Sequence, residues 1–333
     1  MKDNLHTDNL IHVEDLSISF KTFAGPVNIV RHTSLTLKAG EILGLVGESG
    51  SGKSITVGAL LGLYTGTSAQ VTCQQLDILG QDCRDYREED WRALRGSRVA
   101  MIFQDPMTAL NPILTIGSQI REALPAHKNT KERAIELLKQ VGLTDPERRV
   151  DQYPHELSGG MRQRVVIAMA LAGEPDIIIA DEPTTALDVT TEAQILVTLQ
   201  KLIRQEGLGM IFISHNLRVV SQLCDRVMVM YGGQWVEDGS VDAIFYAPQH
   251  PYTKALLAAL PQGKQRGQLE SIPGQPPDVA HRPSGCAFHP RCGQAMQVCQ
   301  AMEAPIEEVD VHQEQRIRCW LPAAERSLTH DGQ

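Results

Sequence analysis

Short apolar stretches alternate with longer amphipathic stretches between about residue 10 and residue 245. The apolar stretches have the length of buried strands and lie at Ile42–Val46, 99–103, 177–180, 210–214 and Arg226–Tyr231. The amphipathic stretches predict helices over residues 131–141, 161–172 and 191–206. Strands that alternate with helices are typical of a largely parallel sheet that helices cover on both faces. The pattern therefore predicts an α/β fold.

Three segments depart from this alternation. Residues 10–37 predict antiparallel strands around a turn at Gly25-Pro26, and residues from about 105 to 165 hold more helix than strand. Residues 261–285 are rich in Pro, Gly and Gln, as in a linker or an extended arm. We therefore expect a first domain over residues 1–250, with a helical subdomain at about 105–165, followed by a linker and a small extension over residues 251–333.

Composition sets broad limits on the class of protein. The 333 residues are enough for one large α/β domain plus a smaller attachment, and 42% hydrophobic residues are ordinary for a globular protein. The net charge of -9 argues against nucleic acid as a partner. No apolar run approaches the roughly 20 residues of a membrane-spanning helix, and the first residues lack the apolar core of a secretory signal. We expect the chain to stay inside the cell, and any membrane work to need other subunits.

Residues 47–54 read GESGSGKS and fit the phosphate-binding loop G-x-x-x-x-G-K-[ST]. The apolar strand before them and the helical pattern after them favour this interpretation over a simple turn of small residues. The glycines let backbone N–H groups face phosphate oxygens, Lys53 reaches the β- and γ-phosphates, and the Ser54 hydroxyl suits Mg²⁺. The residues that we expect to bind the nucleotide here are Gly47, Ser49, Gly50, Gly52, Lys53 and Ser54.

Two carboxylates, Asp181 and Glu182, end the apolar strand at residues 177–180. Successive side chains of a strand face opposite ways, so the pair can divide two roles. Asp181 can hold the Mg²⁺ shell, and Glu182 can polarise the attacking water or accept its proton. Alone, the pair could equally be solvated acids that cap a strand; beside a phosphate-binding loop, the catalytic interpretation is favoured.

Residues 157–161, LSGGM, open the predicted helix with a serine and two glycines. Ser158, Gly159 and Gly160 present N–H groups at the positive end of a helix, which suits an anion, although a serine cap can also serve structure alone. This stretch resembles the signature loop of ABC ATPases. Met161 departs from the family's usual glutamine; because the phosphate contacts come from Ser158 and backbone N–H groups, we expect little loss.

The other elements of ABC ATPases follow in the family's order, over about residues 10 to 245. Phe20 resembles the aromatic residue that stacks on adenine, Gln104 the Q-loop glutamine, residues 186–188 the D-loop with Asp188, and His215 the switch histidine. Taken singly, Phe20 or its neighbour Phe23 could be core, Gln104 a surface amide and His215 a strand-end histidine. Their joint order is what favours the nucleotide site.

The resemblance implies the fold of an ABC ATPase cassette: a mixed central sheet with an antiparallel β subdomain and a helical subdomain. It implies that the chain binds and hydrolyses ATP, with Mg²⁺ held by Ser54, Gln104 and Asp181 and with Glu182, His215 and Gln104 in catalysis. It also implies a composite site, in which the signature loop of a second cassette closes over ATP, because phosphoryl transfer depends on positioning and electrostatic stabilisation.

The C-terminal part narrows the resemblance. Residues 250–257 and 286–292 resemble the C-terminal extension of oligopeptide/dipeptide importer ATPases, and four of the seven cysteines gather there: Cys286, Cys292, Cys299 and Cys319. In a chain without an export signal, such a cluster indicates metal ligation, and four thiolates suit Zn²⁺ or a [4Fe–4S] cluster. The absence of a Cys-x2-Cys pair counts against a zinc ribbon. The resemblance implies the [4Fe–4S] cluster; Zn²⁺, free thiols and disulfides stay open.

The sequence therefore predicts the ATPase subunit of a peptide importer, peripheral at the cytoplasmic face of the cell membrane. The partners implied by the resemblance are a second ATPase subunit, two integral membrane permease subunits and an extracytoplasmic solute-binding protein, with no nucleic acid. Similar cassettes serve nickel, opine and sugar importers. A soluble ABC ATPase of the chromosome class is disfavoured, because the segment between residues 54 and 157 is too short and too interrupted by prolines for a long coiled coil.

Overall fold

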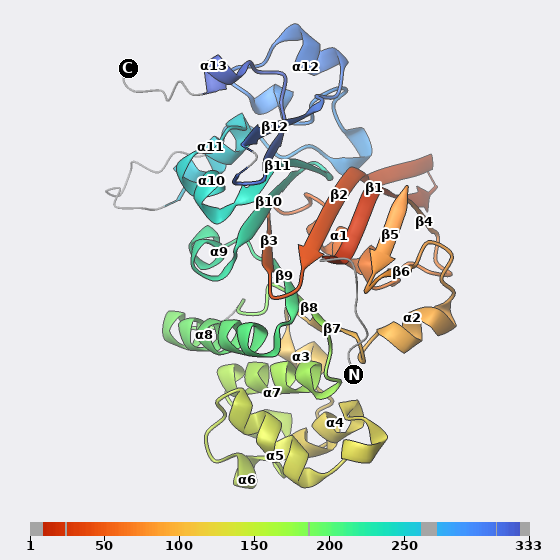
Figure 1. Cartoon of the computed structure of the whole chain (residues 1–333), viewed down its shortest axis with the longest axis vertical. Coiled ribbons are helices and arrows are strands. Elements are labelled where there is room, and N and C mark those ends of the chain that lie inside the picture. The colour runs from red at the N-terminus through yellow and green to blue at the C-terminus, as the bar shows by residue number, and fades with distance from the viewer. Residues whose placement is uncertain (1–8, 24, 186, 261–271, 311, 327–333) are drawn as a thin grey trace. The chain divides into compact units, whose positions relative to one another are not determined.

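The computed structural model of the chain describes residues 9–23, 25–185, 187–260, 272–310 and 312–326 (Figure 1). These residues form two compact units, each built from separated stretches of sequence. Unit 1 takes its described residues from 9–11, 36–42 and 77–213, and unit 2 from 12–35, 43–76 and 214–326. Ala186 of the predicted D-loop and residues 261–271 of the predicted linker lie outside the described residues.

Parallel strands form the sheet of unit 1. They are β7 (Val99–Ile102), β8 (Ile177–Asp181) and β9 (Gly209–Ile213), and β8 pairs with both of the others. Residues 177–180 of β8 are fully buried, which explains their unbroken apolar run: a parallel strand that is covered on both faces has no solvent side. At another point of the unit, Asp77 and Ile78 of β5 (Gln75–Ile78) pair antiparallel with β6 (Gln81–Asp82).

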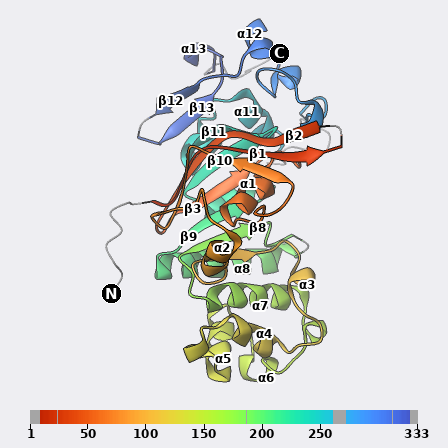
Figure 2. The same ribbon diagram turned by 90° about the vertical axis from the view of Figure 1, so that its right-hand side faces the viewer.

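The helices of unit 1 include a group formed by α4, α5, α6 and α7, which lie together in Figures 1 and 2. Both α4 and α5 pack on α7. Residues 105–165, all described, hold helices and no strand, as the sequence predicts. The helices of unit 1 as a whole are α2 (Glu88–Leu94), α3 (Pro106–Ala109), α4 (Ile116–Ala123), α5 (Lys131–Gln140), α6 (Pro146–Arg149), α7 (Gly159–Ala172) and α8 (Val189–Glu206), with 3-10 turns at Ala126–Lys128 and Pro154–Glu156.

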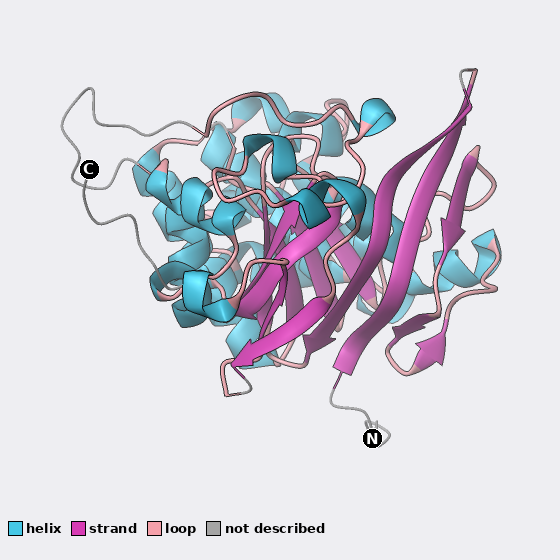
Figure 3. Cartoon of the chain, turned by 90° about the horizontal axis from the view of Figure 1, so that it is seen from above, coloured by secondary structure: helices cyan, strands magenta, loops and turns pink. Residues whose placement is uncertain are grey.

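Unit 2 holds most of a long hairpin, β1 (Asn9–Thr22) and β2 (Gly25–Lys38). The strands are neighbours in one sheet, and because so short a connection joins them they run antiparallel, as the sequence predicts. On its other side, β1 pairs antiparallel with β4 (Ala69–Thr72). In Figure 3 the long strand that follows the N-terminus is β1.

A second sheet of unit 2 joins the two ends of the sequence. Strand β3 (Ile42–Val46) runs parallel to β10 (Arg226–Tyr231), which pairs antiparallel with β11 (Gln234–Ser240). Strand β13 (Gln315–Arg318) of the C-terminal extension pairs with β11, and β12 (Ile306–Asp310) pairs with β13. The helices here are α1 (Lys53–Leu60), α9 (Leu217–Leu223), α10 (Val241–Tyr246), α11 (Pro251–Ala258), α12 (Gln297–Ala301) and α13 (Ala323–Arg326), with 3-10 turns at Val279–His281 and His289–Arg291.

His250 caps α11 from a buried position. Its Nδ1 accepts a hydrogen bond from the Tyr252 N–H at 3.0 Å, and the residue is 1% exposed. Burial lowers the pKa of His250 to about 3, and the nearby Arg326 charge acts in the same direction. The folded state therefore holds a neutral imidazole, whereas the unfolded chain takes up a proton near the ordinary pKa of about 6.5. The stability that depends on this group is complete above that pH and is lost as the pH falls towards 3.

Replacement of His250 by Asn is expected to flatten this pH dependence. Asn can accept the same capping hydrogen bond but does not titrate, so it removes a slope of up to about 1.4 kcal/mol per pH unit. Urea unfolding at pH 7 and pH 5 checks this: the free energy of unfolding should fall less in the variant than in the natural chain. Equal losses in the two proteins would mean that His250 is not the proton acceptor.

Candidate nucleotide site

The loop of residues 47–54 connects β3 to α1 in unit 2. Three of its glycines have a positive φ: 146° at Gly47, 77° at Gly50 and 99° at Gly52. A Cβ atom at Gly47 would lie 2.1 Å from the carbonyl oxygen of Met230, so that only glycine fits there. The conformation is the one that turns successive backbone N–H groups towards a common centre, which is what an anion needs.

Lys53 lies inside this loop. The residue is 8% exposed, and its Nζ donates to the Gly47 carbonyl at 2.8 Å, to the Glu48 carbonyl at 3.0 Å and to the Ser51 Oγ at 3.3 Å. The ammonium group thus sits against the loop backbone at the N-terminus of α1, where both the helix dipole and its own charge favour an anion. Ser54, in the first turn of α1, is exposed, so that its hydroxyl is within reach of solvent.

The other predicted residues of unit 2 are Phe20 and His215. The Phe20 ring is half-buried and packs edge-to-face on Tyr64, with centroids 5.5 Å apart, whereas Phe23 is fully exposed. His215 is exposed and precedes α9. Phe20 therefore has one ring partner within the unit.

Asp181 ends β8 in unit 1, and Glu182 follows in a left-handed conformation with φ 46°. The Glu182 N–H donates to the carbonyl oxygen of Ile213 at 3.0 Å, which holds this turn in place. The Glu182 carboxylate accepts hydrogen bonds from Gln104 Nε2 and from Thr185 Oγ1, each at 3.1 Å. A non-glycine residue with positive φ is costly and is concentrated at functional sites. The sequence predicted Gln104 and Glu182 separately; the structure joins them.

The signature loop and the D-loop region meet within unit 1. Ser158 caps α7 by accepting from the Met161 N–H at 3.4 Å. Asp188 caps α8 through the Thr191 N–H at 3.0 Å, and hydrogen bonds from Thr191 hold the pKa of Asp188 below its usual value. A Cβ atom at Gly160 would lie 2.4 Å from Thr191 Cγ2. Gly160 is therefore needed for close packing as well as for its N–H, which the sequence reasoning missed.

The predicted nucleotide residues are divided between the units. Unit 2 holds Phe20, the loop with Lys53 and Ser54, and His215; unit 1 holds Gln104, residues 158–160, Asp181, Glu182 and Asp188. Each set suits Mg²⁺ and ATP by its own geometry. In unit 2, the loop of residues 47–54 has no room for a Cβ atom at Gly47, as in a backbone cradle for phosphate. In unit 1, Asp181 and Glu182 offer two adjacent carboxylates, and the Gln104 amide orients that of Glu182.

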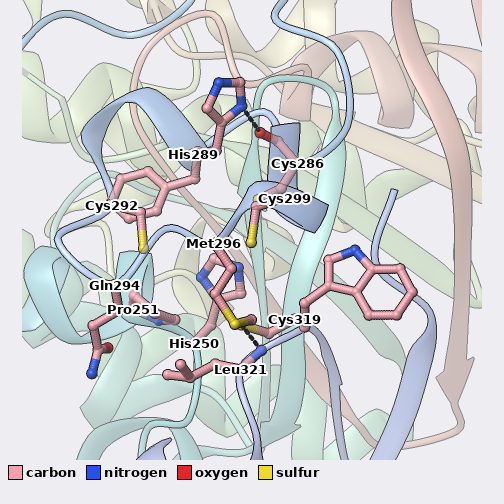
Figure 4. Close-up of a pocket in the computed structure, with 12 residues that line it drawn as sticks. His250, Pro251, Cys286, His289, Cys292, Gln294, Met296, Cys299, Cys319 and Leu321 are labelled. Atoms are coloured by element: carbon pink, nitrogen blue, oxygen red, sulfur yellow. Dashed lines mark hydrogen bonds between the residues drawn. The ribbon is translucent and has the colours of Figure 1, made fainter. Parts of the chain in front are cut away.

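The four clustered cysteines line one pocket of unit 2 (Figure 4). A backbone hydrogen bond from the Cys286 N–H to the Cys299 carbonyl, at 2.8 Å, brings two of them together. Cys319 Sγ accepts from the Leu321 N–H at 3.4 Å. All seven cysteines of the chain are described, and none of them forms a disulfide bond.

The prediction of a [4Fe–4S] cluster, with Zn²⁺ as its alternative, is wrong. Among the described residues, no group of three or more His, Cys, Asp or Glu is arranged to hold a metal ion. A tetrahedral metal site needs the four sulfur atoms around one centre, and the described cysteines that line this pocket are not arranged in that way. Burial raises the pKa of Cys286 to about 11 and also raises the pKa of Cys292 and Cys319. The spacing of the cysteines along the chain shows that four thiols gather in one region, but it does not show how their sulfur atoms are arranged.

Comparison with known proteins defines the class. The family described as "ABC transporter" matches residues 30–185, and "Oligopeptide/dipeptide transporter, C-terminal region" matches residues 236–299. The Bacillus subtilis oligopeptide transport ATP-binding protein OppD is 47% identical over 95% of this chain and 90% of its own length. The Escherichia coli dipeptide transport ATP-binding protein DppD is 49% identical over 88% of this chain and 91% of its own length.

Solved structures agree in fold. The ATP-binding cassette MJ0796, in a dimeric post-hydrolysis state bound to ADP and Pi, has a TM-score of 0.61 at 26% identity and covers 69% of this chain and 98% of its own. The protein cbiO1 of Clostridium perfringens, part of an ABC transporter complex, also has a TM-score of 0.61 at 26% identity, over 72% of this chain and 92% of its own. The predicted cassette fold is confirmed.

This chain belongs to the ABC transporter ATPases, the class whose cassettes hydrolyse ATP. Within that class its similarity is to the ATP-binding proteins of oligopeptide and dipeptide transport, and it extends through the C-terminal region. The names of those relatives give ATP binding and oligopeptide or dipeptide transport. Among the residues that the structure describes, no helix is long and apolar enough to cross a membrane.

Proposed function

We propose that this chain energises the uptake of oligopeptides or dipeptides across the cytoplasmic membrane by hydrolysing ATP. The observation that carries the proposal is the joint match of a transporter cassette and of the oligopeptide/dipeptide C-terminal region in one chain. The second match runs from β11 through α11 into the cysteine-lined segment, which a cassette alone does not need. Cargo of the peptide class is therefore favoured over nickel, opines or sugars.

In the proposed site, residues of the loop at 47–54 bind the phosphates of ATP: Gly47, Ser49, Gly50, Gly52, Lys53 and Ser54. Phe20 contacts the adenine. Ser54, Gln104 and Asp181 would hold Mg²⁺, which when bound neutralises charge on the phosphate oxygens. Support comes from the buried Lys53 and from the exposed positions of Ser54 and Gln104.

For hydrolysis, Glu182 orients the attacking water and accepts its proton, and Gln104 holds the Glu182 carboxylate in position. His215 acts with them at the γ-phosphate. The signature residues Ser158, Gly159 and Gly160, together with Asp188, serve ATP that is bound to a second cassette, so that two cassettes close on the nucleotide. The dimeric structures of the cassette MJ0796 support this arrangement.

The proposed assembly contains this chain, a second ATPase subunit, two integral membrane permease subunits and an extracytoplasmic solute-binding protein. The chain is peripheral at the cytoplasmic face of the membrane. We assign residues 1–250 to the cassette, with a helical subdomain at about 105–165, and residues 251–333 to the linker and the C-terminal extension.

Purification of the chain from native membranes tests this proposal. We expect two integral membrane proteins, a second ATPase and a solute-binding protein to be recovered with it and identified by mass spectrometry. Peptides bound to that solute-binding protein would identify the cargo class. Recovery with soluble proteins alone, or with DNA, would leave the ATPase in place and overturn the transport function.

A further inference from the structure

Arg291 of the C-terminal extension has every N–H group of its guanidinium matched to an acceptor. Nη1 donates to Glu48 Oε2 at 2.6 Å and to the Tyr231 hydroxyl at 3.2 Å, and Nη2 donates to Glu48 Oε1 at 3.2 Å and to the Ile272 carbonyl at 3.3 Å. Nε donates to the Pro273 carbonyl at 2.8 Å. Five donors thus meet five acceptors, and the side chain is 5% exposed. The Arg291 side chain therefore has one fixed geometry.

Glu48, the acceptor of the bidentate pair, belongs to the phosphate-binding loop. Its N–H donates to the Tyr252 hydroxyl at 3.0 Å, and its carbonyl oxygen accepts from Lys53 Nζ at 3.0 Å and from the Ser51 N–H at 3.2 Å. Glu48 therefore binds the C-terminal extension through its carboxylate and binds Lys53 through its backbone carbonyl oxygen. A displacement of Glu48 moves a hydrogen-bond acceptor of the lysine.

The surroundings of this pair are closely packed. The ring centroid of Tyr231 lies 4.5 Å from that of Tyr252 and 5.2 Å from that of Phe288, and the Arg291 guanidinium carbon lies 5.8 Å from the Tyr231 ring centroid. The Gly233 N–H, beyond the end of β10, donates to the Ser51 carbonyl at 2.9 Å. Packed rings and backbone bonds of this kind transmit a shift in the extension to the loop instead of absorbing it.

Attachment of the extension does not need this ion pair. Strand β13 already pairs with β11, and Arg316 of β13 forms an ion pair with Asp238 of β11 at 2.5 Å. A charge pair that is largely removed from water adds little stability, because desolvation offsets much of its attraction, but a bidentate pair fixes the direction of both side chains. The Glu48–Arg291 pair is thus better explained by the geometry that it imposes on the loop than by the stability that it adds.

We propose that Arg291 is a positioning residue for ATP binding: through Glu48, the C-terminal extension holds the phosphate-binding loop in the conformation that receives the phosphates. The inference rests on the proposed role of residues 47–54. It makes the extension a part of the ATP site in cis, and it gives the segment at residues 272–292 a function in the ATPase cycle. Release of Arg291 lowers the affinity for ATP without touching the residues that carry out hydrolysis.

Kinetics of the full chain in its membrane complex test the inference. We expect Arg291→Gln and Glu48→Gln each to raise the KM for ATP about tenfold, with kcat changed less than about twofold, since one charge-assisted pair is lost. The double variant is expected to match either single variant, because both remove the same interaction. Arg291→Lys keeps the charge but not the planar fork, so its KM should stay close to that of Arg291→Gln.

The matched control is Glu307→Gln, which breaks another ion pair of the extension and should leave KM unchanged. A merely structural role predicts lower melting temperatures of the nucleotide-free variants with KM at the natural value, and that result overturns the inference. So does a natural KM in Arg291→Lys, or a KM raised equally by Glu307→Gln. Lys53→Ala distinguishes failure of the inference about Arg291 from failure of the proposed role of residues 47–54. If Lys53→Ala binds ATP normally, the assignment of residues 47–54 as the phosphate-binding loop is itself wrong.

Discussion

Replacement of Glu182 by Gln is expected to lower the rate of ATP hydrolysis about 1000-fold, the scale of a lost general base, while ATP binding persists. The amide oxygen of Gln can accept the hydrogen bonds that Gln104 and Thr185 now donate to the carboxylate, so that the geometry is retained. What is lost is the group that accepts the proton of water. Because ATP is bound but not hydrolysed, two cassettes are expected to accumulate in the closed dimer.

Phosphate release and the size of the ATP-bound complex measure both parts of this prediction. Glu174→Gln is the control, because Glu174 forms an ion pair with Lys128 in the same unit, with an oxygen–nitrogen distance of 2.6 Å, and lies outside the proposed site. It should hydrolyse ATP at the natural rate. Normal turnover by Glu182→Gln, with its pairing partner present, would remove Glu182 from its role.

Replacement of Lys53 by Ala is expected to weaken ATP binding at least about 100-fold, since a buried charge at the phosphates contributes more than one ordinary hydrogen bond. The loss has two sources. The phosphates lose the ammonium group, and the carbonyl oxygens of Gly47 and Glu48 lose the donor that holds the loop. Equilibrium binding of a fluorescent ATP analogue to the full chain measures the effect.

The control for this variant is Lys128→Ala, which removes a surface ammonium group and should bind the analogue as the natural chain does. Thermal melting without nucleotide shows whether the Lys53 variant is folded. A folded Lys53→Ala protein with natural affinity would contradict the phosphate-binding role of the loop at residues 47–54.

Local signals in the sequence were sufficient for the strands and for the loop. The limits of β3 and β10 are those predicted, because both runs are almost entirely apolar and end at glycine-containing turns. Strand β8 extends one residue beyond the prediction because Asp181 still pairs with Ile213. Helix α8 begins at Val189 instead of residue 191, because Asp188 supplies the cap.

Features that depend on packing between distant residues were not predictable. The left-handed backbone of Glu182 is held by Ile213, and the need for glycine at position 160 comes from Thr191. Neither constraint leaves a pattern in the local sequence. The motifs indicated which residues matter, and only the structure gives the direction in which they point.

The C-terminal extension was the least predictable part. Its amino-acid composition separates it from the cassette, yet β13 completes a sheet with β11, and Arg291 binds a residue 243 positions earlier in the chain. The cysteines were misinterpreted for a related reason: spacing shows that four thiols gather in one region, but the fold decides whether their sulfur atoms surround one centre.

The sheet of unit 2 also bears on how the protein is synthesised, because its strands come from both ends of the chain. A ribosome releases β3 and the phosphate-binding loop long before it releases β10, β11 and Arg291. Until then the loop lacks the neighbouring Met230 carbonyl, the Gly233 N–H and the partner of Glu48 that shape it. The phosphate-binding loop is therefore made early, whereas the groups that complete its surroundings are made later, Arg291 last of all.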